Sequence, residues 1–397
     1  MRILTINSGS SSIKFSIYNI EKTSEARIAV GAINNIGLTD GGFHVKVVEG
    51  AEQKKPISVP DHNFAIKAIL DWLETGSFIK SIDGVGHRVV HGGRTFKSPA
   101  IVTDALLTEL RNITHLAPNH LPHEILAIES FRRFIPEVKQ VACFDTAFHC
   151  EMPQTARAYP LPRYLTEAGI VRYGFHGLSY EYVINALARE AASKNLPSRV
   201  VIAHLGHGAS MAAIKDGKCV DTTMGFTPAG GLVMSTRTGD LDPGVILYLL
   251  MQKGMTPEEV SELVYKKAGL LGVSGSSADM KELLEKANND PMAKEATSLF
   301  CYQAKKTVGA FTAVLGGLDV LVFTGGIGEN APYVRHAICD GLEYLGINID
   351  EALNEKNETI ISKTDGGVIV RVIKTNEELM VARHTCNALT EQMPLEK

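Results

Sequence analysis

The chain has 397 residues, of which 45% are hydrophobic, 21% charged and 7% aromatic, and this composition excludes a disordered chain because such chains are poor in apolar residues. Its 40 Lys and Arg against 44 Asp and Glu give a formal net charge of −4, without the basic excess typical of proteins that bind nucleic acid or anionic membranes. No run approaches the ~18 apolar residues of a membrane-spanning helix.

The start of the chain and the cysteines indicate the compartment. The first residues, MRILTINSGSSS, are typical of a strand and a small-residue turn, so we expect no signal peptide. The cysteines are scattered without a CxxC pair, which excludes the usual structural zinc site and a disulfide framework. We therefore expect a cytoplasmic protein whose thiols fill the core. The six cysteines are Cys143, Cys150, Cys219, Cys301, Cys339 and Cys386.

The predicted elements begin with a β-hairpin. Arg2–Ile6 form a strand, Asn7–Ser12 form a small polar turn, and apolar alternation resumes from Ile13 to Ile17. A helix is expected at Asp104–Asn112. The Pro-rich stretch Met152–Pro162 is the expected boundary between two domains.

The second half repeats the strand–turn–strand pattern. A helix at Tyr180–Lys194 is expected to precede a strand at Arg199–Ala203, a turn at Gly206–Ser210 and a strand at Met211–Ile214. The recurrence of this hairpin suggests two domains of related design.

Helix and strand signals alternate through the remainder. Thr256, Pro257 and Glu259 have the N-cap, N1 and N3 identities of a capping box, and an apolar stripe follows. Strands that alternate with helices indicate an α/β fold. Further helices are expected at Ala278–Ala287 and Met292–Leu315, and a buried strand at Leu318–Thr324.

Three turns that follow strands have the composition of phosphate sites. They are Asn7–Ser12 with Lys14 nearby, Gly206–Ser210, and Gly325–Asn330. Small residues let backbone N–H groups approach an anion, and a lysine adds a point charge. We expect the third turn to open a helix, whose N-terminus favours anions. Three such turns in one chain favour phosphate binding.

Two other interpretations stay open. Gly326, Gly328 and Ala331 fit the GxGxx[GA] dinucleotide pattern, but neither Glu343 nor Asp350 ends a clear second strand. No Walker motif and no GxSxG elbow is present.

The spacing of three histidines, HxxxxHxxH, matches no common metal-ligand pattern. These histidines are His115, His120 and His123.

Arg, His and Asp cluster in glycine-rich segments between the turns. These segments are Gly86–Gly93, Phe144–His149, Tyr173–Gly177 and Ser235–Asp240. Arginine offers a planar fork to carboxylate or phosphate oxygens. Phosphoryl transfer needs positive charge around the migrating group, a metal on the nucleotide and a held nucleophile, and these residues supply the protein's part.

Together, these segments resemble the acetate kinase family, within the wider acetate and sugar kinase, Hsc70 and actin superfold. The resemblance covers essentially the whole chain through ordered, separated motifs. They are NSGSSSIKF at Asn7–Phe15, GHRVVHGG at Gly86–Gly93, FDTAFH at Phe144–His149, RYGFHG at Arg172–Gly177, TRTGDLDPG at Thr236–Gly244, FTGGIGEN at Phe323–Asn330 and TNEE at Thr375–Glu378.

The resemblance implies a two-domain actin-like (ribonuclease H-like) α/β kinase fold with an interdomain cleft that closes over the substrates and excludes water. The N-terminal domain would span residues 1–150 and be rejoined by a C-terminal helix at 380–397, and the nucleotide-binding domain would span residues 151–379. The implied reaction is reversible phosphoryl transfer from ATP to a short-chain acid, acetate first and propionate second. Mg²⁺, with Mn²⁺ as a substitute, and a homodimer are implied in the same way.

The family's roles carry over residue by residue. For chemistry, the resemblance implies Asp145 at the reacting centre and His176 and Arg237 on the transferring phosphoryl group. For Mg²⁺ it implies Asn7 and Glu377, in part through water. The carboxylate would be bound by Arg88, with Val90, Asn119, His120, Phe175 and Pro228 around it. The nucleotide would be bound by Lys14, His204, Leu205, Gly206, His207, Gly208, Asp279, Met280, Lys281, Gly326, Ile327, Gly328, Glu329 and Asn330.

Three positions depart from the family's pattern. His207 replaces the Asn of HLGNG, Asn119 replaces the Leu of LAPLHNP in the acyl pocket, and Lys281 replaces an Arg beside adenine. These departures leave open the preferred acid and another phosphoryl donor such as pyrophosphate. An actin- or Hsc70-like ATPase module would leave Arg88, Asp145 and His176 without a role.

Overall fold

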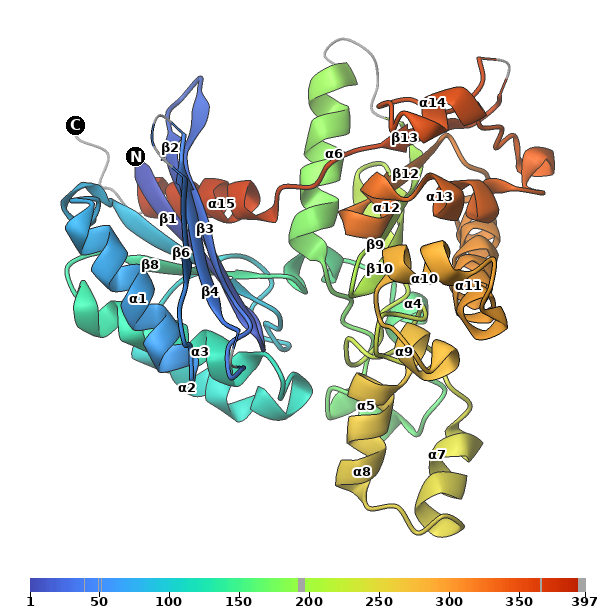
Figure 1. Ribbon diagram of the computed structural model, residues 1–397, viewed down its shortest axis with the longest axis horizontal. Coiled ribbons are helices and arrows are strands. Elements are labelled where there is room, and N and C mark those ends of the chain that lie inside the picture. Colours follow the sequence, from blue (N-terminus) through green and yellow to red (C-terminus); the bar gives the residue numbers. More distant parts are fainter. Residues whose placement is uncertain (39, 49, 51, 192–196, 365, 392–397) are drawn as a thin grey trace. The chain divides into compact units, whose positions relative to one another are not determined.

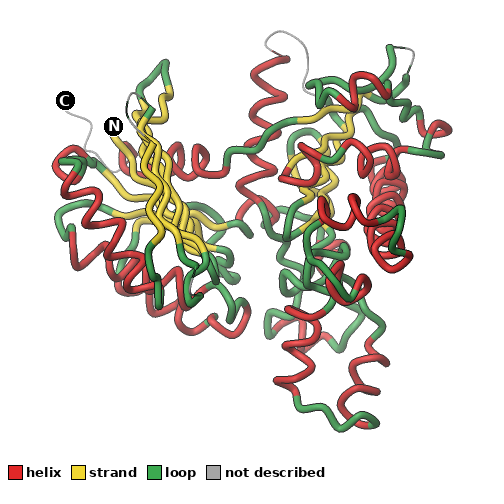
Figure 2. The backbone as a smooth tube through the Cα atoms, viewed as in Figure 1, coloured by secondary structure: helices red, strands yellow, loops and turns green. Residues whose placement is uncertain are grey.

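The computed structural model describes residues 1–397 except 39, 49, 51, 192–196, 365 and 392–397 (Figure 1). The chain forms two compact units. Unit 1 consists of Met1–Ala147 together with Asn376–Lys397, and unit 2 consists of Phe148–Thr375. Each unit contains one β-sheet with helices packed on it, so the expected α/β class is confirmed (Figure 2).

The sheet of unit 1 has eight strands in the order β5-β4-β3-β2-β1-β6-β8-β7. The predicted N-terminal hairpin is confirmed: β1 and β2 are antiparallel, with Ile6 opposite Phe15. On its other side β1 is parallel to β6, which is parallel to β8. The strands are β1 Arg2–Ser8, β2 Ser12–Ile20, β3 Glu25–Asn34, β4 Gly42–Val47, β5 Glu52–Pro56, β6 Gly84–Val89, β7 Ala100–Ile101 and β8 Gln140–Phe144.

Helices cover both faces of this sheet. Val85 of β6 belongs to the core that also contains side chains of α1 and α3. Its neighbours Gly84 and Gly86 point to the opposite face, where a Cβ at Gly86 would lie 2.2 Å from Thr385 Oγ1 of α15. The glycines therefore let α15 pack directly on the strand. The helices are α1 His62–Thr75, α2 Asp104–Asn112, α3 Leu121–Phe134 and α15 Glu377–Glu391, with 3₁₀ turns at Ile79–Ser81 and Thr114–Leu116.

Two helix predictions in unit 1 have different outcomes. The helix expected at Asp104–Asn112 is confirmed at those bounds as α2. The C-terminal helix begins at Glu377 rather than at residue 380, and is described through Glu391. The remainder of its predicted span, residues 392–397, lies outside the described residues.

The sheet of unit 2 has five strands in the order β11-β10-β9-β12-β13. The predicted second hairpin is confirmed as antiparallel β9 and β10. Strand β12 is parallel to both β9 and β13, and Thr324 at its end lies opposite His204. The strands are β9 Arg199–Leu205, β10 Ala209–Lys215, β11 Lys218–Thr222, β12 Val320–Thr324 and β13 Ile369–Val372.

The described helices of unit 2 follow most of the sequence predictions. The capping box at Thr256 and Glu259 is present. The helix expected at Tyr180–Lys194 begins at Gly177, and residues 192–194 lie outside the described residues. The helices are α4 Gln154–Arg157, α5 Arg163–Glu167, α6 Gly177–Ala191, α7 Pro243–Met251, α8 Pro257–Glu262, α9 Gly269–Ser274, α10 Met280–Lys286, α11 Pro291–Leu315, α12 Gly325–Asn330, α13 Pro332–Cys339 and α14 Glu351–Glu355. Shorter turns are the 3₁₀ segments Ala147–His149 and Glu343–Leu345 and the π-helical Leu263–Lys267.

One prediction in unit 2 is wrong. Gly325–Asn330, expected as a turn before a helix, is itself the short helix α12. Gly325 alone makes the turn, with a φ of 77° that suits glycine. The Asn330 amide then donates to the Gly326 carbonyl over 2.9 Å. In the described part of the chain, no helix is both long and apolar enough to cross a membrane.

A fully buried arginine joins α12, α13 and α14. Arg335 is 0% exposed. It donates to the Gly328 carbonyl at 2.9 Å, to Asn354 Oδ1 at 2.8 Å and to Asn357 Oδ1 at 2.7 Å. Burial lowers its pKa to about 10. Gly328 and Asn354 are buried with it, so these two acceptors depend on this one cation for their hydrogen bonds, whereas Asn357 is exposed.

Arg335→Met is expected to lower the free energy of unfolding by about 3–5 kcal/mol, because it leaves several buried acceptors without donors. Lys67→Met is the control, since Lys67 is 71% exposed in its ion pair with Asp71 and should cost under ~0.5 kcal/mol. Calorimetric unfolding of both variants measures the difference. Equal shifts would show that Arg335 has no special role in stability.

Candidate active site

The first group of predicted site residues lies at the ends of parallel strands in unit 1. Arg88 of β6 pairs with Cys143 of β8, so Asp145 emerges one residue beyond the end of β8, beside the same edge. The Arg88 guanidinium donates from Nε to both Asp145 oxygens at 3.2 Å and from Nη2 to Oδ2 at 2.7 Å. Glu377 Oε2 lies 3.0 Å from Arg88 Nη1.

The cluster of Arg88, Asp145 and Glu377 is largely shielded from solvent. The side chains of Arg88, Asp145 and Glu377 are 16%, 1% and 14% exposed. Burial acts to lower the pKa of Arg88, but the charges of Asp145 and Glu377 outweigh it and raise that pKa above its ordinary value. The cation is therefore permanent, and a bidentate fork in a low-dielectric setting is suited to carboxylate or phosphate oxygens.

The predicted metal ligands and Lys14 lie on neighbouring elements of the same unit. Asn7 and Lys14 are opposite each other in the β1–β2 hairpin, and Glu377 is the first residue of α15. The Asn376 side chain accepts from Tyr18 Oη and from the Leu379 N–H, both at 3.0 Å, and so fixes the start of α15.

The turn after β1 is tied to the helices around it. His62 Nε2 is 2.8 Å from the Gly9 carbonyl, and Ser8 Oγ donates to the His123 carbonyl over 3.3 Å. The rings of His62 and His123 stack at 3.8 Å. His115 instead contacts the carbonyl of Asn112. No group of three metal-ligating side chains occurs among the described residues, so the histidine metal site considered from sequence receives no support.

Asn119 and His120 directly precede α3, and both are half-buried. Val90, directly after β6, is buried, and its N–H is 3.2 Å from both carboxyl oxygens of Glu124. Glu124 had no sequence signal, because one acidic residue in an amphipathic helix is normally a solvated surface group.

The second group of predicted residues lies around the β9–β10 turn of unit 2. His176 Nδ1 is 2.8 Å from Ser210 Oγ, and its ring stacks on that of His204 at 4.3 Å. His204 Nδ1 is in turn 2.8 Å from Ser179 Oγ. Both imidazoles are therefore oriented through Nδ1. His176 has a φ of 58°, a conformation that a non-glycine residue adopts only under tertiary constraint.

The glycines of this turn leave a space bounded by nitrogen donors. A Cβ at Gly208 would lie 3.3 Å from His176 Nε2 and 3.6 Å from Arg237 Nη1. A Cβ at Gly206 would lie 3.3 Å from the Gly208 carbonyl oxygen and 3.9 Å from both the Gly326 backbone nitrogen and His204 Nε2. We call the space around Gly206 and Gly208 the glycine cradle. Backbone nitrogens, imidazoles and a guanidinium around glycine are suited to phosphate oxygens.

Arg237 is held by its own loop. Its Nη1 donates to the Pro228 carbonyl over 3.1 Å. Burial lowers its pKa from the ordinary value, so the cation is poorly compensated by solvent and favours an incoming anion. A Cβ at Gly269, which has a φ of 62°, would lie 2.1 Å from the Met234 carbonyl, so only glycine lets this loop close.

Phe175 is 1% exposed, and its carbonyl lies 3.0 Å from His149 Nε2. Desolvation lowers the pKa of His149 to about 4, so this histidine is neutral. Gly174 has a φ of 76°, and a Cβ there would lie 2.6 Å from His149 Cγ. His149 therefore supports the loop that carries Phe175 and His176, a role that the sequence motif alone did not define.

Other residues predicted to bind nucleotide have structural partners. Glu329 Oε1 accepts from the N–H groups of Gly325 and Thr375 at 3.0 and 3.1 Å, and so joins α12 to the end of unit 2. Asp279 caps α10 by accepting from the Lys281 N–H over 2.8 Å. Met280 is buried, and Lys281 and His207 are exposed. The His207 carbonyl accepts from the Ser235 N–H.

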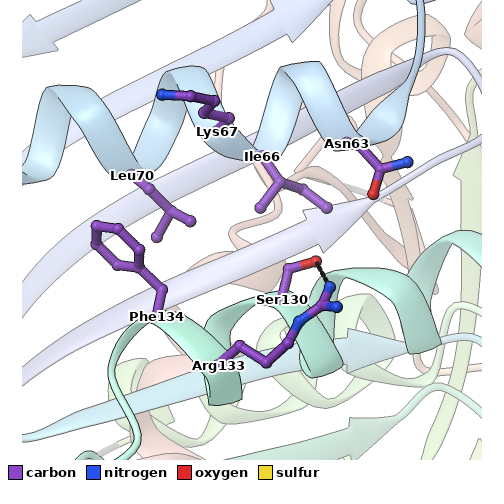
Figure 3. A pocket seen from close by; sticks show the side chains of 7 residues that line it. All are labelled: Asn63, Ile66, Lys67, Leu70, Ser130, Arg133 and Phe134. Atoms are coloured by element: carbon purple, nitrogen blue, oxygen red, sulfur yellow. Dashed lines mark hydrogen bonds between the residues drawn. The ribbon is translucent and has the colours of Figure 1, made fainter.

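The structure thus brings the predicted residues together in two groups, one in each unit. A separate shallow groove lies between α1 and α3 and includes none of them (Figure 3). There, Arg133 donates to Ser130 Oγ over 3.3 Å, while Leu70 and Phe134 supply an apolar wall (Figure 3). Side chains that sequence reasoning missed are Glu124, His149, Ser179, Tyr180, Ser210, Thr324 and Thr375.

Some of these missed residues support the groups directly. Tyr180 Oη is hydrogen-bonded to Ser210 Oγ, which holds His176. The Thr324 hydroxyl is buried at the end of β12 without a hydrogen-bond partner in the described part of the chain. Ser210, His149, Thr324 and Thr375 belong to segments singled out in the sequence without a role of their own, whereas Glu124, Ser179 and Tyr180 lie on ordinary helices.

Comparison with known proteins agrees with this geometry. Residues 2–383 match the model of the acetokinase family. A propionate kinase of Citrobacter rodentium is 44% identical over 99% of this chain and 98% of its own. An acetate kinase of Rhodopseudomonas palustris is 45% identical over 96% of this chain and 97% of its own.

Solved structures extend the similarity to the fold. The acetate kinase of Porphyromonas gingivalis superposes with a TM-score of 0.87 at 37% identity, over 98% of this chain and 99% of that one. A propionate kinase of Francisella tularensis gives a TM-score of 0.91 at 36% identity, over 97% and 99%.

The fold and the two groups of side chains define a kinase that phosphorylates a carboxylate, and the expected actin-like fold is confirmed. The chain belongs to the acetokinase family. The dinucleotide-binding interpretation of the segment after β12 is therefore wrong, since that segment is a short helix within this fold.

Gly208→Ala is expected to raise the KM for ATP at least about tenfold, because the methyl group would fill the cradle beside His176 and Arg237. Gly309→Ala in α11 is the control, since nothing lies within 4 Å of its added Cβ. It should raise stability by about 0.5–1 kcal/mol without changing kinetics. Steady-state kinetics and thermal unfolding check both variants, and an unchanged KM in Gly208→Ala would remove the cradle from nucleotide binding.

Proposed function

We propose that this enzyme transfers the γ-phosphoryl group of ATP reversibly to acetate, with propionate as the second substrate. The observation that carries this proposal is the solvent-shielded Arg88 guanidinium beside Asp145, at the ends of the parallel strands β6 and β8. A carboxylate oxygen attacks the γ-phosphorus, the bond from that phosphorus to the bridging oxygen breaks, and acyl phosphate and ADP form.

We assign acid binding to Arg88, which orients the carboxylate, and to Asp145 at the reacting centre. The proposed apolar surroundings of the acid are Val90 and Phe175, both buried, and Pro228. One methylene changes binding in such a pocket by only about 1–3 kcal/mol. Relatives at similar identity are named for each of the two acids, which supports naming both. Asn119 and His120 complete the proposed acid-binding set.

We assign the transferring phosphoryl group to His176 and Arg237, whose nitrogens face the position of Gly208. Donors already oriented by Ser210 and Pro228 need little reorganisation as charge develops. The proposed nucleotide residues are Lys14, His204, Leu205, Gly206, His207, Gly208, Asp279, Met280, Lys281, Gly326, Ile327, Gly328, Glu329 and Asn330.

We propose Mg²⁺ as the metal of the nucleotide, with Mn²⁺ as a substitute. Asn7 and Glu377 would hold it, since an amide oxygen and a carboxylate are the hard ligands that Mg²⁺ prefers, and α15 packs against β1, which carries Asn7. When bound, the ion neutralises charge on the phosphate oxygens. We also propose a cytoplasmic protein that binds neither nucleic acid nor membranes, which its net charge of −4 supports.

We propose the N-terminal domain as residues 1–150 with the C-terminal helix, and the nucleotide-binding domain as residues 151–379. The division of contacts between Ala147 and Phe148 supports this assignment.

We further propose a homodimer formed through α7. This helix, PGVILYLLM, is almost wholly apolar, yet none of its residues is buried. Leu247, Tyr248 and Met251 are 55%, 49% and 74% exposed. Water contact with so much apolar surface is costly, and a second copy of the same face would remove it.

Met251→Lys is expected to shift the mass in sedimentation equilibrium from twice 43.0 kDa toward 43.0 kDa, because the charge would be buried in the proposed interface. Met292→Lys is the control, since Met292 of α11 is also exposed, at 59%. A monomeric wild-type protein, or a dimer that Met251→Lys leaves intact, would contradict this interface.

The proposed function is tested by trapping acyl phosphate with hydroxylamine, using Mg²⁺, ATP and formate, acetate, propionate, butyrate or lactate. Product with acetate or propionate is expected from the wild-type protein. Arg88→Ala should raise the KM for the acid by about 100-fold or more while changing ADP binding little, because only the carboxylate loses its charge partner.

Two outcomes would contradict the proposal. One is the absence of product with every acid from folded wild-type protein. The other is equal weakening of acid and ADP in Arg88→Ala, which would remove Arg88 from the acid site.

A further inference from the structure

A third carboxyl group lies close to Arg88 and has no part in the proposed reaction. Glu124, in the first turn of α3, is 3% exposed. Both its oxygens are 3.2 Å from the Val90 N–H. A buried carboxyl group is costly, so one that accepts a backbone N–H at a strand end needs an explanation.

Glu124 holds the backbone segment that carries the acid site. Val90 follows directly after β6, two residues beyond Arg88. On the neighbouring strand, the Asp145 N–H donates to the Val89 carbonyl over 3.0 Å. The peptide groups around Val89 and Val90 are therefore fixed by Asp145 and Glu124, and a shift of either would move Arg88.

The charge balance gives Glu124 a second effect. Arg88 already has Asp145 and Glu377 as ionised partners, so the site must accept the acid as a further anion. An ionised Glu124 would add another negative charge near Arg88 in a poorly solvated setting. An uncharged Glu124 would not oppose the incoming carboxylate.

We propose that Glu124 is a positioning residue for the acid substrate: it fixes Val90 and Arg88 through the backbone, and its uncharged form leaves the Arg88 site able to bind one more anion. This inference rests on the proposed function and names a residue that controls substrate binding at the same site.

The surroundings of Glu124 support its uncharged form. The pKa of Glu124 is raised to about 8, and burial is the largest cause. The charge of Asp145 also raises it, whereas the Val90 N–H and the charge of Arg88 lower it. Glu377 of α15 pairs with Arg88, and the ionisable residues next to Glu124 in the sequence are His123 on α3 and His120 just before it. As the pH rises through about 8, Glu124 becomes charged.

The pH dependence of the KM for acetate tests the proposal, with ADP release as the readout. In the wild-type enzyme this KM should rise by about tenfold or more between about pH 7 and about pH 9.5, as Glu124 ionises. Glu124→Gln keeps the acceptor for Val90 but cannot ionise, so its KM should stay nearly constant over that range. The KM for ATP is the internal reference, because most of its proposed residues lie in unit 2.

Two further variants separate positioning from packing. Glu124→Ala removes the acceptor, and should raise the KM for acetate about tenfold at neutral pH. Glu129→Gln on the same helix, where Glu129 is 34% exposed in an ion pair with Arg111, should keep the wild-type profile. Thermal unfolding shows whether each variant is folded.

An alkaline rise that persists unchanged in Glu124→Gln would overturn the proposal. So would a folded Glu124→Ala enzyme with a wild-type KM for acetate. Failure of the proposed function looks different, since the wild-type protein itself would then form no acyl phosphate.

Discussion

The proposed acid site depends on the burial of one guanidinium, that of Arg88. Removing Arg88 from water is expensive, and the cost is offset because Asp145 and Glu377 accept its N–H groups from two different elements. The same arrangement fixes the ends of β6 and β8 and the start of α15, so the geometry of unit 1 and the chemistry of its site rest on one set of contacts. In unit 2, the buried Arg237 donates to the Pro228 carbonyl instead of a carboxylate, so its positive charge is less well compensated than that of Arg88.

A comparison of the two groups shows why one suits an acid and the other a phosphate. The Arg88 guanidinium is paired with the carboxylates of Asp145 and Glu377. It can therefore orient a small anion without a large excess of positive charge in the site. Around the glycine cradle the donors are imidazole nitrogens, backbone N–H groups and one arginine, which suit the spread charge of phosphate oxygens. The hydroxyl groups of Ser179 and Ser210 are essential to this arrangement because they decide how the two imidazoles are turned.

Much of this was predictable from the sequence. Both hairpins, helix α2 and the capping box at Thr256 follow from local signals that the structure confirms. Arg88, Asp145 and His176 stand out as members of Arg, His and Asp clusters in glycine-rich segments, but their individual roles come from the resemblance to the acetate kinase family. Glu124 was not found, since nothing local separates a buried acid on a helix from an exposed one. The helix at Gly325–Asn330 was missed because the motif does not show that the Glu329 side chain accepts a hydrogen bond from the Gly325 N–H.

The packing of α15 against β6 bears on how the protein is made. Gly84 and Gly86 have no side chains to cover that face of the strand, so Leu389, Thr385 and Val381 of the last helix must do so. These residues are synthesised after all of unit 2. Part of the unit 1 sheet therefore stays uncovered until α15 has been synthesised. Glu377 lies at the start of this helix, so until then the proposed acid site also lacks one of the carboxylates that pair with Arg88.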